Sequence, residues 1–269
     1  MTMKQSRLQV RPPHVNVMVK ACELAGRSLI RDFNEVEHLR VSRKSPGDFV
    51  CVADSRSEKI IMEELSKARP EYGIISEESG VMDAEEGCDY TWIIDPLDGT
   101  TNFLHGLSHF CVTVALKKGD EIVSGVIYDP IKDELFWAEK GMGAYLNQGR
   151  IRVSQRKSLE LSLLATGIPF GQQGNKVRFL KNLASVMPLV SGVRRFGVAA
   201  LDLAYVACGR FDAYFEEDIK IWDIAAGVLL VKEAGGMVSE FNGGKDILKC
   251  ETVLASNVDL SAPLKHLFS

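Results

Sequence analysis

The sequence lacks several features that would place the protein in a specialised class. Its six cysteines are scattered singly, with no Cys-x-x-Cys pair and no histidine at zinc spacing, which excludes a zinc finger and a disulfide-stapled miniprotein. No segment approaches the roughly 18 consecutive apolar residues that a membrane helix requires. Residues 1–20 hold no apolar segment of the kind found in secretory signals. Together with the unpaired cysteines, these absences predict a cytoplasmic protein with no membrane partner.

An excess of charge of one sign is also absent. The 32 basic and 36 acidic residues give a formal net charge of −4 (32 − 36). This balance provides no general attraction for nucleic acid or anionic lipid, so no direct nucleic-acid partner is expected. With 46% hydrophobic and 25% charged residues in a chain of 269, the composition is that of a globular protein long enough to bury a substantial core.

The first third of the chain has helical periodicity interrupted by a turn. Apolar residues recur at steps of three and four over residues 15–36, which predicts an amphipathic helix. A second helix is expected from Asp54 to Ala68, with Asp54 or Ser55 as its N-cap. Two short extended segments around a Ser-Pro-Gly turn predict a hairpin over residues 39–52.

The rest of the chain changes pattern near residues 147–149. Residues 91–138 contain short runs of β-branched and aromatic residues between turn signals, which predicts a mainly antiparallel sheet. Beyond residue 149, strands alternate with helices. We therefore expect an N-terminal α+β lobe over 1–150 and a C-terminal α/β lobe over 151–269, joined in one compact unit.

The most informative segment is residues 92–103, Trp-Ile-Ile-Asp-Pro-Leu-Asp-Gly-Thr-Thr-Asn-Phe. An apolar strand ends in Asp95, and Asp98 follows three residues later in an Asp-Gly turn. Two carboxylates that converge on one point are ligands that Mg²⁺ prefers. An Asp-Gly pair after a strand is also a common turn. The spacing differs from that of an EF-hand loop and from the Asp-x-Asp-x-Thr segment of phosphoaspartyl phosphatases.

Three further acidic positions have both a functional and a structural interpretation. Glu77 follows an apolar strand, and with Glu78 it could form a solvated acidic turn. Asp223 opens an apolar helix, where a first-turn acid also complements the helix dipole. Asp48 follows a glycine and could belong to ordinary turn chemistry. Asp54 is interpreted as a helix cap.

Residues 92–103 resemble the signature of the inositol monophosphatase family of Mg²⁺-dependent, lithium-sensitive phosphatases. Residues 47–54, 74–79 and 221–227 resemble the other motifs of that family and occur in the family's order, so that the resemblance covers close to the whole chain. It implies an α+β fold, arranged as a layered αβαβα sandwich, with two or three Mg²⁺ ions as cofactors. By analogy it also implies a homodimer.

The resemblance also implies a set of metal ligands. Glu77, Asp95 and the backbone carbonyl of Leu97 would hold one ion. Asp95, Asp98 and Asp223 would hold the second, so that Asp95 bridges the two. Clustered Mg²⁺ ions can neutralise the phosphoryl oxygens, lower the pKa of a water molecule for in-line attack and stabilise the departing oxygen. No covalent enzyme intermediate is needed.

Catalytic and phosphate-binding roles follow from the same resemblance. Glu77 and Thr100 would orient the attacking water, with Thr100 paired to Asp48. The backbone N–H groups of Gly99, Thr100 and Thr101, at the start of a helix, would bind the phosphate.

The C-terminal half is expected to contact the rest of the substrate. Residues 196–202 resemble the family's substrate segment, which implicates Gly197, Val198 and Ala199. Glu216 lies where the family has a carboxylate that accepts hydrogen bonds from hydroxyl groups. Val198 stands where serine or threonine is usual, so the identity of the substrate is less well defined than the reaction.

We therefore predict an enzyme that hydrolyses a phosphate monoester, with inositol 1-phosphate as the first candidate substrate. Fructose 1,6-bisphosphatase and nucleotide 3′-phosphatase activities are alternatives, because enzymes with these activities share the metal motifs. A regulatory protein that binds the transcription machinery is an alternative of another class.

Overall fold

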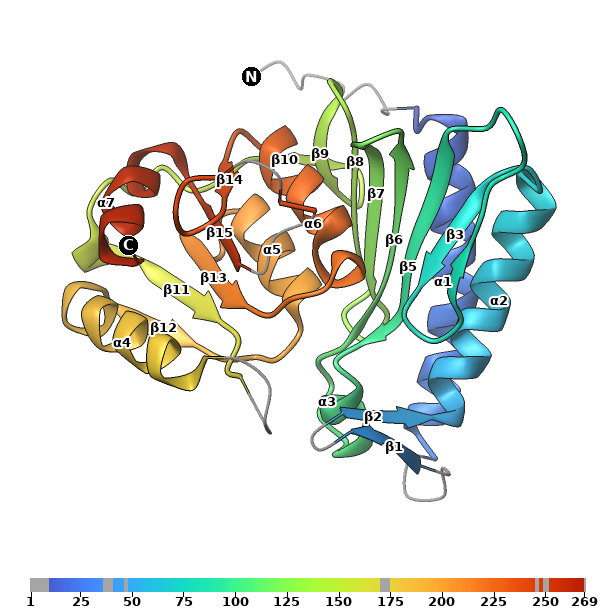
Figure 1. The fold of residues 1–269 in the computed structure, drawn as a ribbon, viewed down its shortest axis with the longest axis horizontal. Helices are drawn as coiled ribbons and strands as arrows, with labels where there is room; N and C mark the ends of the chain where they lie inside the picture. The colour runs from blue at the N-terminus through green and yellow to red at the C-terminus, as the bar shows by residue number, and fades with distance from the viewer. Residues whose placement is uncertain are drawn as a thin grey trace, which may run out of the picture.

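The protein is described from a computed structural model, drawn in Figure 1. The structure describes residues 10–35, 41–45, 48–169, 175–244, 247–248 and 252–268, and for 41–45 and 48–51 it describes the backbone alone. Pro46 and Gly47 of the predicted turn lie outside these ranges. No helix within the described ranges is long and apolar enough to cross a membrane.

The first helix, α1 (Pro13–Phe33), confirms the predicted amphipathic segment. A proline at its first position suits a helix start, because the proline lacks an N–H that would have no intrahelical acceptor there. Next come β1 (Val41–Ser45) and β2 (Asp48–Cys51), which pair antiparallel as the predicted hairpin. The second helix, α2 (Val52–Ala68), begins two residues earlier than predicted. Asp54 is therefore the third residue inside this helix, in its first turn, and does not stand at the N-cap position that the sequence analysis gave it.

An eight-stranded sheet follows, in the order β10-β9-β8-β7-β6-β5-β3-β4. Its neighbours pair antiparallel except β3 and β5, which run parallel. The strands are β3 (Gly73–Ser76), β4 (Gly80–Met82), β5 (Tyr90–Asp98), β6 (Cys111–Lys118), β7 (Glu121–Asp129), β8 (Glu134–Glu139), β9 (Gly143–Leu146) and β10 (Gly149–Ile151). The predicted antiparallel sheet is thus present, with a parallel pair at the strand that carries Asp95 and Asp98.

A second, five-stranded sheet has the order β12-β11-β13-β15-β14. Its strands are β11 (Leu163–Thr166), β12 (Gly192–Arg194), β13 (Ala213–Glu217), β14 (Met237–Ser239) and β15 (Thr252–Ser256). Two helices cover its outer face, α4 (Lys176–Val186) and α7 (Val258–Phe268), and two short 3₁₀ turns, η2 (Leu159–Leu161) and η3 (Met187–Leu189), belong to the same region. The alternation of strands and helices predicted beyond residue 149 is present from β11 to β14.

Two helices, α5 (Ala199–Ala207) and α6 (Ile221–Glu233), lie between the sheets (Figure 1). Side chains alternate along β5 in agreement with this arrangement: Ile93 joins the core against α5 and α6, whereas Trp92 and Ile94 join the core beneath α1 and α2. Figure 1 shows five successive layers: α1 with α2, the first sheet, α5 with α6, the second sheet, and α4 with α7. The predicted αβαβα sandwich is confirmed.

Candidate active site

An irregularity in β5 brings Asp95 and Asp98 to one face of the first sheet. In a regular strand, residues three apart point to opposite faces. Here Asp95 is opposite Thr113 and Asp98 is opposite Cys111, so that three steps along β5 match two along β6. The extra residue restores both aspartates to the face toward α5. Asp95 is held in place by the Leu97 N–H, which donates to its Oδ1 at 3.0 Å.

Gly99 and a five-residue helix, α3 (Thr100–Leu104), follow directly. Gly99 has φ +99° in the left-handed region, and a Cβ there would lie 2.8 Å from Cγ2 of Val198. Both the turn and the close approach therefore require glycine. Predicted phosphate-binding residues Thr100 and Thr101 are the first two residues of α3, where backbone N–H groups have no intrahelical acceptor.

The hydroxyl of Thr100 connects α3 to α2. It lies 3.1 Å from Oδ1 of Asp54 and 3.1 Å from the carbonyl oxygen of Leu97. Asp54, which is buried, is therefore one acidic partner of Thr100 in the structure, whereas the predicted pairing of Thr100 with Asp48 stays a prediction. The backbone of Asp48 lies in β2, but its side chain is outside the described part of the chain.

Two aspartates bind backbone N–H groups across the middle of the molecule. The Ala200 N–H, in the first turn of α5, donates to Oδ2 of Asp98 at 2.8 Å. The Lys220 N–H donates to Oδ2 of Asp223 at 2.9 Å, so Asp223 does cap the start of α6. In each case one carboxylate oxygen is bound by the backbone, and the hydrogen bonds recorded among the described residues leave the other oxygen available.

The predicted acids are close enough for their charges to interact. Burial raises the pKa of Asp95 well above its usual value, and the charges of Glu77, Asp98 and Asp223 raise it further. Burial also raises the pKa of Asp98 to about 7, against the lowering effect of the Ala200 N–H. The pKa of Asp223 is raised by burial and then by Asp98. The structure thus brings Glu77, Asp95, Asp98 and Asp223 together from β5, the turn after β3, and α6.

This acid cluster fits a hard divalent cation by the chemistry of its donors, which are carboxylate oxygens with little compensating positive charge. Among the described residues, no three acid, imidazole or thiol groups are close enough together to hold an ion in their present positions. Like charges this close to one another raise the energy of the site. A cation would remove that repulsion.

The residues predicted to contact the substrate lie on β13 and in the segment that leads into α5. The hydroxyl of Tyr214 donates to Oε2 of Glu216, and burial raises the pKa of Glu216 to about 7. The carboxylate lies against Gly167, where a Cβ would come within 1.9 Å of it. Electrostatic interaction with Asp98 links Glu216 to the acid cluster.

The loop that contains Gly197, Val198 and Ala199 is fastened to α3. The side-chain amide of Asn102 donates to the carbonyl oxygens of His109 at 2.9 Å and Phe196 at 2.8 Å. Val198 is 1% exposed and its side chain packs against Gly99. The loop therefore lies beside the Asp98 turn, and the side chain of Val198 is covered.

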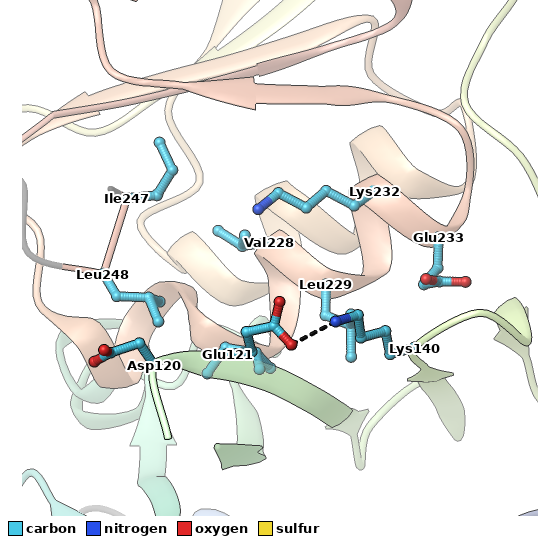
Figure 2. A pocket seen from close by; sticks show the side chains of 10 residues that line it. Asp120, Glu121, Lys140, Val228, Leu229, Lys232, Glu233, Ile247 and Leu248 are labelled. Atoms are coloured by element: carbon cyan, nitrogen blue, oxygen red, sulfur yellow. Dashed lines mark hydrogen bonds and ion pairs between the residues drawn. The ribbon is translucent and has the colours of Figure 1, made fainter. Parts of the chain in front are cut away.

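A pocket of about 240 Å³ lies elsewhere, between the β6–β7 hairpin and the C-terminal half of α6 (Figure 2). Nζ of Lys140 lies 2.5 Å from Oε2 of Glu121, a pair marked by the dashed line in Figure 2, and Lys232 and Glu233 line the same pocket. The residues that line it include no member of the acid cluster. We therefore place the candidate site at the acid cluster and not at this pocket.

Three further residues of α2 contact the site segments and were missed in the sequence analysis. Asp54, Ser57 and Glu58 are all buried. Ser57 donates to the carbonyl oxygen of Pro96 at 2.7 Å, and Glu58 accepts hydrogen bonds from the turn that contains Glu77. The signal in the sequence that could have revealed these three residues is their i, i+3, i+4 spacing, because it places them on one face of the helix.

The five-layer fold and the acidic site place the chain in the αβαβα class, and comparison with known proteins identifies the family. Residues 12–267 match the inositol monophosphatase family. An inositol-1-monophosphatase of Mesorhizobium japonicum is 53% identical over 243 residues, which cover 90% of this chain and 91% of that protein. The chain belongs to the inositol monophosphatase family of phosphatases.

Relatives with another name are almost as similar. The Nus factor SuhB of Xylella fastidiosa is 48% identical over 231 residues, 86% of this chain and 83% of that protein. The crystal structure of the extragenic suppressor protein suhB from Bartonella henselae has 50% identity and a TM-score of 0.93, and the match covers 96% of this chain and 99% of that one. These similarities extend over both sheets.

Proposed function

We propose that this chain hydrolyses a phosphate monoester in a Mg²⁺-dependent reaction, with inositol 1-phosphate as its substrate. The observation that carries the proposal is the cluster of Glu77, Asp95, Asp98 and Asp223, whose charges interact around the buried carboxylate of Asp95. A cluster of acids around a buried carboxylate is costly unless a cation compensates it. Its retention beside a turn with free backbone N–H groups supports a site for metal and phosphate together.

The ligands that we propose are oxygens of this cluster. Glu77, Asp95 and the carbonyl of Leu97 would hold one ion, and Asp95, Asp98 and Asp223 a second, in a total of two or three. When bound, Mg²⁺ supplies positive charge to the phosphoryl oxygens and the departing oxygen, and it acidifies water. The N–H groups that bind Asp95, Asp98 and Asp223 support the assignment, because each orients one carboxylate and leaves an oxygen for a cation.

The residues of the chain would position the nucleophile and the phosphate. Thr100 donates its single hydroxyl proton to Asp54 or to the Leu97 carbonyl, so its oxygen remains an acceptor for a water proton. Glu77, on the other side of Asp95, would accept the second water proton. We propose that the backbone N–H groups of Gly99, Thr100 and Thr101 bind the phosphate oxygens.

The substrate proposal depends on Glu216 and its surroundings. A carboxylate with Tyr214 on one oxygen can accept hydrogen bonds from sugar or polyol hydroxyls on the other. Inositol 1-phosphate offers such hydroxyls next to its phosphate, and the name of the Mesorhizobium relative supports this choice. Gly197, Val198 and Ala199 would contact the ring from the loop beside Asp98.

Phosphate release from a panel of esters tests the proposal. Inositol 1-phosphate, fructose 1,6-bisphosphate and 3′-phosphoadenosine 5′-phosphate are each incubated with the protein, with and without Mg²⁺ and with added Li⁺. We expect Mg²⁺-dependent, Li⁺-inhibited release that is fastest from inositol 1-phosphate. Preference for either other ester would keep the reaction and replace the substrate, whereas no release from any of them would contradict the proposal.

A second candidate function is regulatory binding to the transcription machinery, favoured by the 48% identity to a protein named as a Nus factor. The test uses Asp95→Asn, which removes a proposed bridging ligand. Binding to purified transcription-elongation components that survives this substitution would support a role independent of catalysis. The homodimer and the cytoplasmic location remain predictions, and sedimentation measures the first.

A further inference from the structure

Among the described residues of α2, Glu58 makes the most side-chain hydrogen bonds to the segment 76–79, which contains Glu77. Its Oε1 accepts from the Ser76 hydroxyl and from the Ser79 N–H at 2.9 Å, and its Oε2 accepts from the Ser79 hydroxyl at 2.6 Å. Glu58 is 6% exposed and Ser76 is fully buried. A carboxylate is rarely buried this far unless its oxygens are satisfied, and here three donors satisfy them.

The three donors bracket Glu77. Ser76 ends β3, and Ser79 closes the turn that leads into β4, so Glu58 binds both ends of the segment 76–79. The Glu77 N–H donates to the carbonyl oxygen of Ile94 at 3.2 Å, which fixes the turn to β5 one residue before Asp95. With both ends bound to one side chain and its backbone bound to β5, the turn has little freedom to move Glu77 away from Asp95.

The neighbouring residue of α2 holds the other ligand segment. Ser57 donates to the carbonyl oxygen of Pro96, within the irregularity between Asp95 and Asp98. One turn of α2 therefore binds both the segment of Glu77 and the segment of Asp95. Because a helix is stiff over one turn, the distance between the two segments is set by adjacent positions on α2.

We propose that Glu58 is a positioning residue that holds Glu77 in the geometry needed to share a divalent cation with Asp95. The inference rests on the proposed function, since it concerns the metal ligands of that site. Glu58 touches neither substrate nor metal in this scheme and acts through the Ser76–Ser79 segment. When a residue that orients a metal-ligating residue without touching the metal is removed, metal affinity or activity typically falls by roughly 10- to 100-fold.

The test compares Glu58→Ala and Glu58→Gln with a matched control on the same helix. Glutamine can still accept from Ser76 and the Ser79 N–H and can donate to the Ser79 hydroxyl, so Glu58→Gln should remain close to the wild type. Glu64→Gln is the control, because Glu64 pairs with Lys20 of α1 at 2.5 Å and makes no recorded contact with the 76–79 segment. Mn²⁺ binding to the purified full chain is measured by calorimetry, beside the Mg²⁺ concentration for half-maximal activity.

We expect Glu58→Ala to weaken Mn²⁺ binding and raise the half-maximal Mg²⁺ concentration by roughly 10- to 100-fold, and Glu64→Gln to change neither. A double-substitution cycle separates positioning from general structural support. In a Glu77→Gln background, Glu58→Ala should have almost no further effect on Mn²⁺ binding, because the group that it positions is already altered. An equal effect in both backgrounds would overturn the proposal.

The proposal can still be tested if Glu58→Ala does not fold or if the proposed function is wrong. If Glu58→Ala does not fold, Ser79→Ala removes one of the three hydrogen bonds and should weaken Mn²⁺ binding in the same direction; unchanged binding would contradict the proposal. If the wild type releases no phosphate from any ester, the proposed function is wrong, and the calorimetric cycle still decides the role of Glu58. An active wild type with unchanged metal binding in Glu58→Ala overturns the inference alone.

Discussion

The hydroxyl oxygen of Thr100 lies 3.1 Å from Oδ1 of Asp54, although the two residues belong to different helices and are 46 positions apart. This contact joins the start of α3 to the first turn of α2, next to the carbonyl of Leu97. It gives Thr100 an acidic partner that the sequence analysis had treated as a helix cap.

Replacing Thr100 by valine is expected to lower kcat by roughly 100-fold or more, since it removes the hydroxyl that would position the water while keeping the side-chain shape. Thr100→Ser retains the hydroxyl and should preserve most of the activity. Steady-state kinetics on inositol 1-phosphate measure both variants. A Thr100→Val enzyme with wild-type kcat would remove this residue from the mechanism.

Repulsion within the acid cluster predicts a pH-dependent stability of the metal-free protein. The pKa of Asp98 is about 7 in the folded chain and 3.8 without the fold. Between these two pKa values the folded state holds a proton that the unfolded state has lost. The stability that protonated Asp98 contributes is therefore complete below about pH 4 and is lost as the pH rises through 7. Burial is the main cause of the raised pKa of Asp98; the charges of Glu77 and Glu216 raise it further, and Arg195 lowers it.

The measurement is thermal unfolding in EDTA at pH 5.5 and pH 8, with Asp98→Asn as the control that lacks the titrating group. The Tm of Asp98→Asn should exceed that of the wild type by roughly 5 °C at pH 8 and by roughly half as much at pH 5.5, because about half of the loss has occurred by that pH. Saturating Mg²⁺ should reverse the order, because the wild type gains the binding energy. The same Tm difference at both pH values would show that repulsion at Asp98 is unimportant.

Gly99→Ala is expected to destabilise the fold for two separable reasons. Its φ of +99° is unfavourable for alanine, and the added Cβ would lie 2.8 Å from Cγ2 of Val198. Urea unfolding should show a loss on the order of 2 kcal/mol or more. Gly87→Ala isolates the backbone cost, since its φ is +85° and nothing lies within 4 Å of its Cβ position. Adding Val198→Ala to Gly99→Ala should recover only the steric part.

Glu216→Gln tests the substrate contact. Loss of a charged acceptor for a polyol hydroxyl should raise KM for inositol 1-phosphate by roughly 10-fold with a smaller change in kcat. Hydrolysis of p-nitrophenyl phosphate, which has no polyol hydroxyls, should be nearly unaffected and serves as the matched comparison. An equal loss on both esters would show that Glu216 supports the acid cluster and not the polyol.

Local signals in the sequence were sufficient for much of the site. Asp95 and Asp98 stand in one continuous motif, Glu77 follows an apolar strand, and Asp223 opens an apolar helix. Asp54 was misassigned because the start of α2 differs by two residues from the prediction, an ordinary uncertainty at helix ends. Glu58 was missed because a glutamate in a helical pattern is usually exposed, and only the packing of α2 against β5 buries it.

By itself, the sequence determined the features that local residue patterns encode. These are the amphipathic α1, the strand that ends in Asp95, and the family motifs in order. The tertiary structure decided which groups meet. The irregularity between Asp95 and Asp98 exists only against β6, Thr100 finds Asp54 only when α2 packs on the sheet, and Asp223 reaches Asp98 only with α6 between the sheets. Such contacts form through burial of distant apolar faces against one another, and local spacing carries no record of that pairing.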